Sequence, residues 1–257
     1  MTRPPSAEQA LRYLQAVQSE LGVEPLAFLV NPNIVLTLAG ARGYADSVEY
    51  YSKKSIFDDW QKILQRLESL GEFQGVQIGN ISAEINPMGD PYLSADYYSR
   101  SGFLYTLEQT HLIPTHELLK AAMTEQPKEL ISQLFGVVKA TYNDKPSDIV
   151  DIIVAGIFLG YPDKAINSAL RFYGAESDSI EPIDAPIHYA DFYICPQPVY
   201  HIEPALKDDP TIIAHSQLWS GILTGVYESE WFTTLQTDDK FISLRDQITS
   251  ENTAAHE

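Results

Sequence analysis

Apolar residues recur at helical spacing in several segments of the chain, and these segments predict helices. Ser6 and Gln9 form a capping box ahead of one apolar stripe, and Gly22 follows it, so a helix is predicted over 7–21. A second helix is predicted over 55–70 on the same grounds. The remaining predicted helices share a proline near their start, where a missing N–H costs little. They cover 116–124, 128–142, 148–159, 163–173 and 211–227.

Other segments lack this period and predict strands. The apolar runs 26–30 and 34–39 flank Asn31-Pro32-Asn33, and this pattern predicts a β-hairpin because proline and asparagine suit turns. Residues 73–86 alternate apolar and polar, which predicts one or two strands. The tyrosine-rich stretch 92–105 is expected to be extended, and 44–51 to form a short helix.

The segment 180–210 contains six prolines, which exclude a helix and predict an extended arm or an edge strand. The whole pattern predicts an α+β fold, with a small antiparallel sheet, N-terminal helices, a helical central block and an extended proline-rich C-terminal arm. We expect one domain over 1–257. The alternative is a subdivision near residue 110, with a mixed α/β part over 1–110 and a mainly helical part over 111–257 that includes the arm.

The net charge of the chain limits the classes of molecule that it is expected to bind. The 257 residues include 35 Asp and Glu against 17 Lys and Arg, for a net charge of −18, and residues 176–257 hold 15 of these acids but only three bases. Such a surface repels nucleic acid and anionic membranes, so direct binding of either is not expected. The acidity fits a well-solvated surface, and the docking of a basic partner, including mimicry of nucleic acid, is the alternative.

The N-terminus has no apolar core of the signal-peptide type, and the longest apolar run, 149–160, is too short to cross a bilayer. We therefore expect a soluble, cytoplasmic protein. The single cysteine excludes an intrachain disulfide framework. The sequence contains no dinucleotide-binding glycine motif, phosphate-binding loop, serine elbow or zinc-protease motif, which removes the commonest enzyme classes.

The first candidate site is the stretch 188–203. It contains His188, Asp191, Cys195, His201 and Glu203, all of them residue types that bind zinc or iron. In an extended chain all but His188 share one face, so His201 and Glu203 become neighbours suited to a metal or to acid–base chemistry. The alternative is an edge segment with aromatic packing and solvated acids, with Cys195 as a small buried residue.

The second candidate is an anion site at Gly40, Arg42 and Gly43. Backbone N–H groups in a glycine loop can face an anion, and the guanidinium of Arg42 can hold a phosphate with two hydrogen bonds. The alternative is a tight turn that places Arg42 on the surface.

The third candidate is an interface formed by Tyr92, Tyr97 and Tyr98, since tyrosine offers a broad apolar face with a polar tip. The alternative is the ordinary preference of tyrosine for strands.

Two function classes remain. We favour a non-enzymatic cytoplasmic protein that acts through protein contacts as an adaptor, a regulator or an assembly factor. The alternative is an enzyme of an unfamiliar family, metal-dependent or not, with a site in 188–203. The sequence names no cofactor or metal, and it leaves open a homo-oligomer.

Overall fold

The computed structural model describes residues 3–50, 72–73, 76–77, 81–87, 92–110, 149–172, 183–188 and 200–246. The predicted helices 55–70, 116–124 and 128–142 lie outside these residues, as does most of the proline-rich arm. The chain is α+β and mostly helical.

Three helices form the N-terminal part: α1 (Ala7–Leu21), α2 (Leu26–Leu29) and α3 (Pro32–Leu38). The first confirms the prediction. The Oγ of Ser6 accepts a hydrogen bond from the N–H of Gln9 at 3.3 Å, and the N–H of Gly22 donates to the carbonyl of Gln18 at 2.9 Å.

The predicted hairpin over 26–39 is wrong, because both of its apolar runs are helical. Asn31 is the N-cap of α3, and its Oδ1 accepts from the N–H of Asn33 at 2.9 Å, while Pro32 occupies the first helical position. All residues of α2 and all of α3 except Asn33 are buried. A helix covered on all sides is apolar on all sides, so periodicity does not separate it from a buried strand.

A three-stranded antiparallel sheet follows, in the order β1 (Tyr44–Tyr50), β5 (Tyr92–Ser99) and β4 (Ile81–Pro87). The short strands β2 (Glu72–Phe73) and β3 (Val76–Gln77) pair separately. The small antiparallel sheet is thereby confirmed, and the segment 73–86 contributes to three strands where one or two were predicted.

Two neighbouring predictions need correction. The segment 44–51 was expected to be helical, but Tyr44–Tyr50 is β1, which is held by its full pairing with β5. The segment 92–105 is extended only to Ser99, whose Oγ accepts from the N–H of Gly102 at 3.1 Å and thereby starts α5 (Arg100–Gln109).

The C-terminal half confirms three predicted helices: α8 (Ile149–Phe158), α9 (Asp163–Phe172) and α10 (Pro210–Tyr227). The side chains described in the second half of α8 are buried, as its all-round apolar sequence predicts. The remaining elements are short. They are β6 (Ile183–Asp184), β7 (His201–Ile202), the 3₁₀ helix Pro204–Leu206, α11 (Glu230–Leu235) and the helical residues 239–246.

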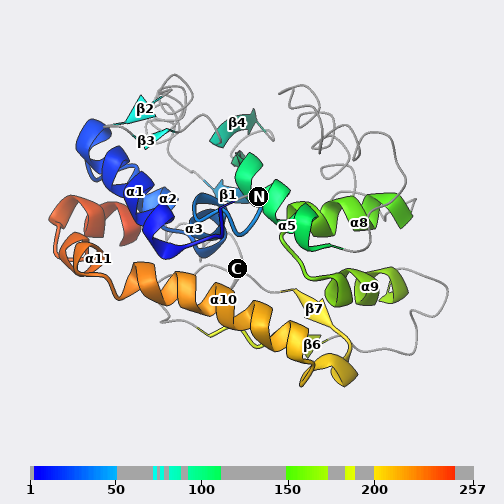
Figure 1. Cartoon of the computed structure of the whole chain (residues 1–257). Coiled ribbons are helices and arrows are strands. Elements are labelled where there is room, and N and C mark those ends of the chain that lie inside the picture. The colour runs from blue at the N-terminus through cyan, green and yellow to red at the C-terminus, as the bar shows by residue number, and fades with distance from the viewer. Residues whose placement is uncertain are drawn as a thin grey trace.

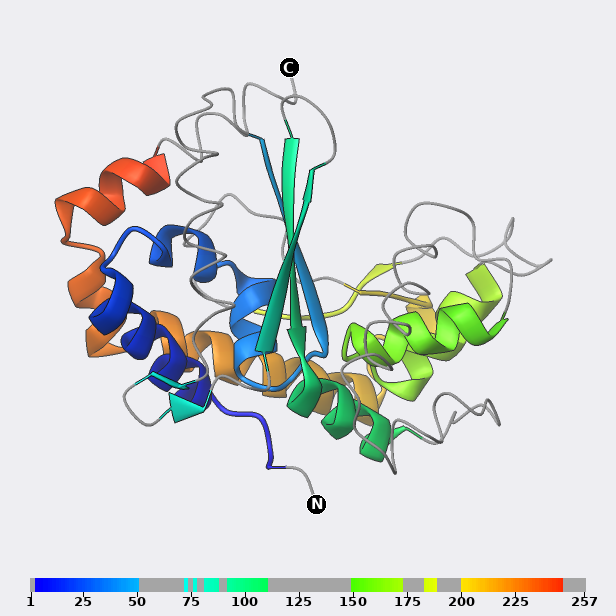
Figure 2. The ribbon, with the colours of Figure 1, turned by 90° about the horizontal axis from the view of Figure 1, so that it is seen from above.

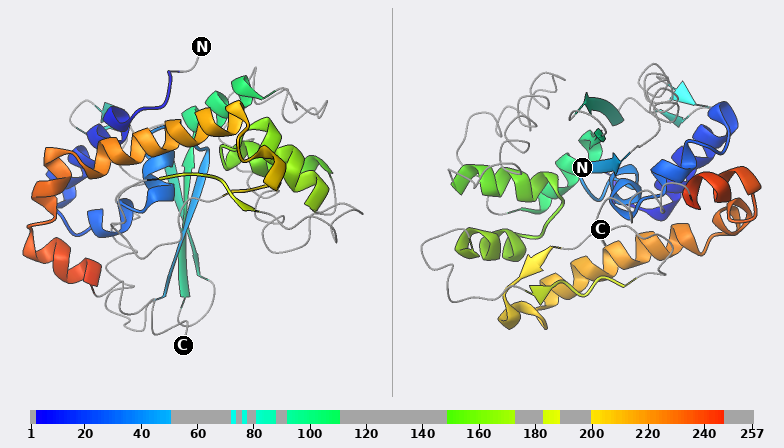
Figure 3. Two further views of the ribbon diagram at one scale, coloured as in Figure 1. Left: turned by 90° about the horizontal axis from the view of Figure 1, so that it is seen from below. Right: turned by 180° about the vertical axis from the view of Figure 1, so that it is seen from behind.

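The long helix α10 connects the two sides of the molecule (Figure 1). It packs on α1 and α3 along part of its length and on α9 near its start. Figure 2 shows the sheet of β1, β5 and β4 between α1–α3 on one side and α8 and α9 on the other. The two views of Figure 3 show α10 running along the base of this arrangement.

The largest buried cluster lies among α1, α2, α3, α10 and α11, with Trp219 of α10 fully buried within it. Among the described residues, none of the helices has the length and apolar character that crossing a bilayer requires.

Candidate functional site

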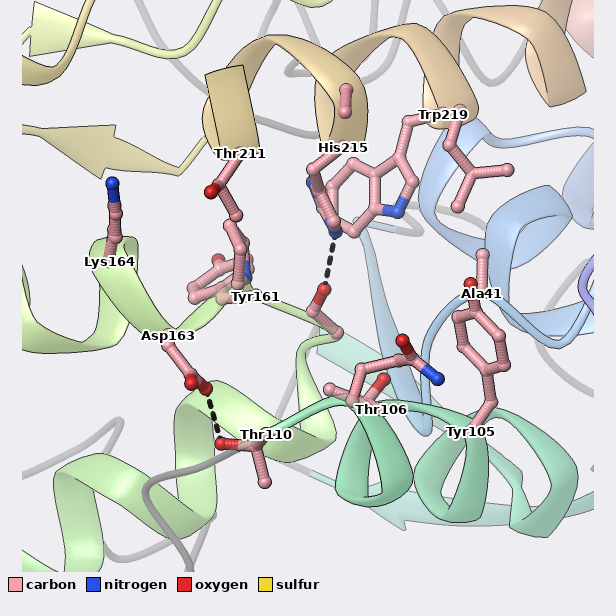
Figure 4. Close-up of a pocket in the computed structure, with 15 residues that line it drawn as sticks. Ala41, Tyr105, Thr106, Thr110, Tyr161, Asp163, Lys164, Thr211, His215 and Trp219 are labelled. Carbon is pink, nitrogen blue, oxygen red and sulfur yellow. Dashed lines mark hydrogen bonds between the residues drawn. The ribbon is translucent and has the colours of Figure 1, made fainter. Parts of the chain in front are cut away.

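A pocket of about 450 Å³ lies where α5, the connection from α8 to α9 and α10 meet (Figure 4). This volume suits a small organic molecule. The walls carry three aromatic rings, several hydroxyl groups and a histidine. The lining residues drawn with labels are Ala41, Tyr105, Thr106, Thr110, Tyr161, Asp163, Lys164, Thr211, His215 and Trp219.

The pocket has an inner end and a mouth. Ala41, Gly160 and Trp219 are buried and form the inner end, whereas Thr211 and Gln109 are exposed and lie at the mouth. In Figure 4 the ring of Tyr105 reaches from α5 toward the end marked by Ala41 and Trp219. A ligand would therefore enter past polar side chains and reach an aromatic inner wall.

His215 lies in this wall with both ring nitrogens engaged. Its Nε2 is 2.8 Å from the carbonyl oxygen of Gly160, and its Nδ1 is 3.0 Å from the hydroxyl of Tyr200. The pKa of His215 is lowered to about 4, chiefly by burial; the Gly160 carbonyl opposes the shift and the nearby Arg42 charge adds to it. The ring is thus neutral at pH 7.

Because the His215 ring is neutral, one of its nitrogens carries a hydrogen and the other accepts a hydrogen bond. A carbonyl only accepts, so Nε2 of His215 carries the hydrogen, and Nδ1 accepts from the Tyr200 hydroxyl. The Oγ of Ser216 lies 3.5 Å from the same hydroxyl, and burial raises the pKa of Tyr200 to about 12. His215 is therefore a fixed part of the wall rather than a free base.

Arg42 lies behind the inner wall, and its charge has no acidic partner among the residues that the structure describes. Its side chain is 4% exposed, and its Nη1 donates to the Oδ1 of Asn33. Its Cζ is 5.5 Å from the centroid of the Trp219 ring, a cation–π contact. Within the described part of the chain no carboxylate pairs with this guanidinium, and its Nε has no hydrogen-bond partner.

Trp219 adds a second unsatisfied donor at the same place. Its Nε1 is buried and has no hydrogen-bond partner in the described structure, although the residue lines the pocket. Buried donors without partners cost about 1–3 kcal/mol each, and more when charged. The side chains of Arg42 and Trp219, each with one such donor, are in contact, which marks this end of the pocket as a candidate binding site.

The charged residues at the mouth are already engaged. Thr110 Oγ1 donates to the carboxylate of Asp163, and Lys164 Nζ pairs with Asp209, the N-cap of α10. The Lys164 partner lowers the pKa of Asp209. Lys164 and Asp209 neutralise each other, whereas the hydroxyl of Thr110 is neutral and does not offset the negative charge of Asp163. Among the described residues, Arg42 is the cation in contact with the inner wall, through the Trp219 ring.

The structure does not bring the described residues of the 188–203 candidate into one cluster. Nδ1 of His201 pairs with Asp184 at 3.2 Å, whereas both carboxylate oxygens of Glu203 accept from Arg171 at 3.0 Å. His188 is exposed, and its backbone N–H donates to Ser220.

Asp191 and Cys195 of this candidate lie outside the described residues. No group of three metal-binding side chains occurs among the residues that are described. The candidate stays a prediction.

The surroundings of Gly40, Arg42 and Gly43 differ from those expected for an anion site on a glycine loop. The N–H of Gly40 donates to the carbonyl of Thr37 at 3.0 Å, and that of Gly43 donates to the carbonyl of Phe158 at 2.8 Å. These two backbone donors are thus occupied, and Arg42 is buried instead of lying on the surface. Of the three residues, Arg42 alone retains an unpartnered donor that the structure describes.

The tyrosines of the interface candidate all lie on β5. Tyr97 is 2% exposed and belongs to the buried cluster, between Ala45 of β1 and Ala83 of β4. The side chains of Tyr92 and Tyr98 lie outside what the structure describes.

The residues that line the pocket are not among the site residues predicted from the sequence. Thr211, His215 and Trp219 stand four residues apart on the predicted helix 211–227 and so share one face. That spacing was the available signal. It did not show which segments cover the face.

Comparisons with known proteins do not assign this site. No protein-family model, no curated protein sequence and no solved structure shows significant similarity to the chain.

Proposed function

We propose that the protein binds a small organic anion, such as an aromatic carboxylate, in the pocket between α5 and α10. The observation that carries this proposal is the buried guanidinium of Arg42 behind the Trp219 wall, which pairs with no carboxylate in the described part of the chain. An isolated buried charge is costly, and a bound anion would offset that cost.

The pocket walls support an aromatic or similarly flat ligand. Tyr105, Tyr161 and Trp219 offer ring faces and edges, against which a planar molecule packs well. Tyr105 and Gln109 add polar groups that fix orientation. The size of about 450 Å³ accommodates such a molecule but excludes a folded partner.

Arg42 would act on the ligand through its field. Its Cζ lies 5.5 Å from the Trp219 ring, so a carboxylate on the far side of the indole would be roughly 9 Å away. At an effective dielectric constant of about 20, that separation corresponds to roughly 2 kcal/mol, or about thirtyfold in affinity.

The first experiment compares the native mass of the purified protein with its denatured mass, which detects a retained ligand. Calorimetric titration then compares benzoate with its neutral analogue benzamide, and extends to larger pairs of carboxylates and amides. We expect the carboxylates to bind more tightly. Equal binding of acid and amide, or no binding in any pair, would contradict the proposal.

Two matched variants place the ligand. Ala214 is exposed and lines the pocket, so Ala214→Trp should block the mouth without disturbing the core. Gln217 is exposed on the same helix but does not line the pocket, so Gln217→Trp should bind normally. Arg42→Met should weaken carboxylate binding about thirtyfold and leave amide binding unchanged. Normal binding by Ala214→Trp would place the ligand elsewhere.

The two function classes drawn from the sequence stay open beside this proposal. A protein that acts through protein contacts needs an accessible docking surface. An enzyme with a site in 188–203 needs at least two side chains of the set His188, Asp191, His201 and Glu203 to converge in a pocket. Both remain predictions.

A further inference from the structure

A second hollow is lined by residues of α1 and α11. Figures 1 and 3 show these two helices near the end of α10 that is distant from α9. The hollow measures about 620 Å³ and is an open groove. Its apolar surface comes from Leu11, Trp231 and Leu235. Its polar lining consists of Gln15, Gln18, Ser229, Glu230, Thr234 and Asp238.

The groove is held in shape by the residues that line it. Trp231 Nε1 donates to the Oε1 of Gln18 at 2.6 Å, which joins α11 to α1 and fixes the indole. Ser229 caps α11 by accepting from the N–H of Phe232 at 3.1 Å. Leu11 and Trp231 are only partly buried, so apolar surface remains open at the bottom of the groove.

The charge around the groove is negative. Glu230 and Asp238 are its two charged lining residues, and both are acidic. The segment 228–239 contains four acids and neither lysine nor arginine. Among the described residues close in sequence to the groove, the bases are Arg12, exposed on α1, Lys240, which pairs with Glu24 at 3.5 Å, and Arg245, which pairs with Asp246 at 2.6 Å. The C-terminal end of α10 adds partial negative charge.

The negative charge around the groove disfavours occupants that are themselves negatively charged. A second copy of the chain would bring another net charge of −18 to an acidic surface, which opposes self-association here. The chain's own segment 247–257 contains two acids and no lysine or arginine, so it is no better matched. Nucleic acid and anionic membranes are repelled for the same reason.

We propose that the groove between α1 and α11 docks a basic amphipathic segment of another protein. Apolar side chains of that segment would pack on Leu11 and Trp231, and its lysines or arginines would face Glu230 and Asp238. An amphipathic helix laid in an apolar groove is a common mode of peptide recognition. The complementary charges would select the partner and speed its association.

Fluorescence anisotropy of three labelled peptides on the full chain tests this proposal. The first is a short leucine–lysine peptide with its leucines on one helical face, the second has the same composition in scrambled order, and the third replaces lysine by glutamate. We expect the first to bind about tenfold more tightly than the second, and the third not to bind. Equal binding of the two basic peptides, or no binding by either, would overturn the proposal.

A pair of charge reversals separates the groove from the overall charge. Glu230 and Asp208 are both exposed, but Asp208 lies near the opposite end of α10. Glu230→Lys should weaken binding of the amphipathic peptide roughly tenfold, while Asp208→Lys should change it less than about twofold. Equal loss in both variants would mean that the peptide responds to net charge alone, and would overturn the proposal.

Discussion

The imidazole of His215 donates a hydrogen bond to the carbonyl of Gly160 across 2.8 Å, although 55 positions separate these residues along the chain. This bond joins α10 to the connection between α8 and α9. It also fixes the neutral histidine in the wall of the pocket, because a pKa of about 4 leaves the ring uncharged at pH 7.

The free energy of unfolding should therefore decrease as the pH is lowered from about 6.5 to about 4. In this window the unfolded chain protonates His215 and the folded protein does not, so acid favours unfolding. The loss should reach roughly 3 kcal/mol at pH 4. His215→Gln keeps an N–H for the Gly160 carbonyl but does not titrate.

Urea unfolding of the native protein and of His215→Gln at pH 7, 5.5 and 4 measures this effect. The difference in unfolding free energy between the two proteins should shrink as the pH falls. A difference that stays constant would show that His215 does not titrate as its burial implies.

Gly160→Ala should destabilise the fold by at least about 2 kcal/mol. Gly160 has a φ of +77°, and a Cβ there would lie 2.5 Å from the carbonyl oxygen of Ala41, which is too close. Gly221 is the control, because it is an exposed position within α10 and an added Cβ there would have nothing within 4 Å. Gly221→Ala should stabilise the protein by up to about 1 kcal/mol. Thermal unfolding of both variants checks the opposite signs.

Asn33→Ala should destabilise the protein by roughly 2 kcal/mol, because it removes the acceptor of the buried Arg42 guanidinium. The double change Asn33→Ala with Arg42→Met should recover part of this loss, since no buried charge then lacks a partner. A double-mutant cycle measured by urea unfolding gives the coupling. Additive effects would mean that Asn33 does not stabilise Arg42.

Replacing both His201 and Glu203 by alanine should abolish any metal content or activity that depends on 188–203. The His201–Asp184 pair is exposed and contributes less than about 1 kcal/mol. The Glu203 side chain is 13% exposed, but its partner Arg171 is largely exposed and stays solvated after Glu203 is replaced, so the variant should stay folded. Metal analysis, activity assays and thermal unfolding of the variant answer both points. Full retention of metal or activity would exclude this segment as the site.

Local signals in the sequence predicted the elements that depend on local interactions. Ser6 and Gly22 mark the ends of α1, Pro162 precedes α9, and Pro210 is the first residue of α10, so capping and proline geometry sufficed there. The hairpin predicted over 26–39 failed because its residues are buried on every side, and burial is a property of the surrounding segments.

The sequence by itself determined the α+β class, the acidic surface and the face of α10 that carries Thr211, His215 and Trp219. Only the tertiary structure decided that this face covers a pocket and that Arg42 lies buried behind it. The physical reason is that the pocket joins segments from Ala41 to Trp219, and their contacts depend on packing between helices distant in the chain. Local spacing identifies which side chains share a face, whereas packing determines what that face meets.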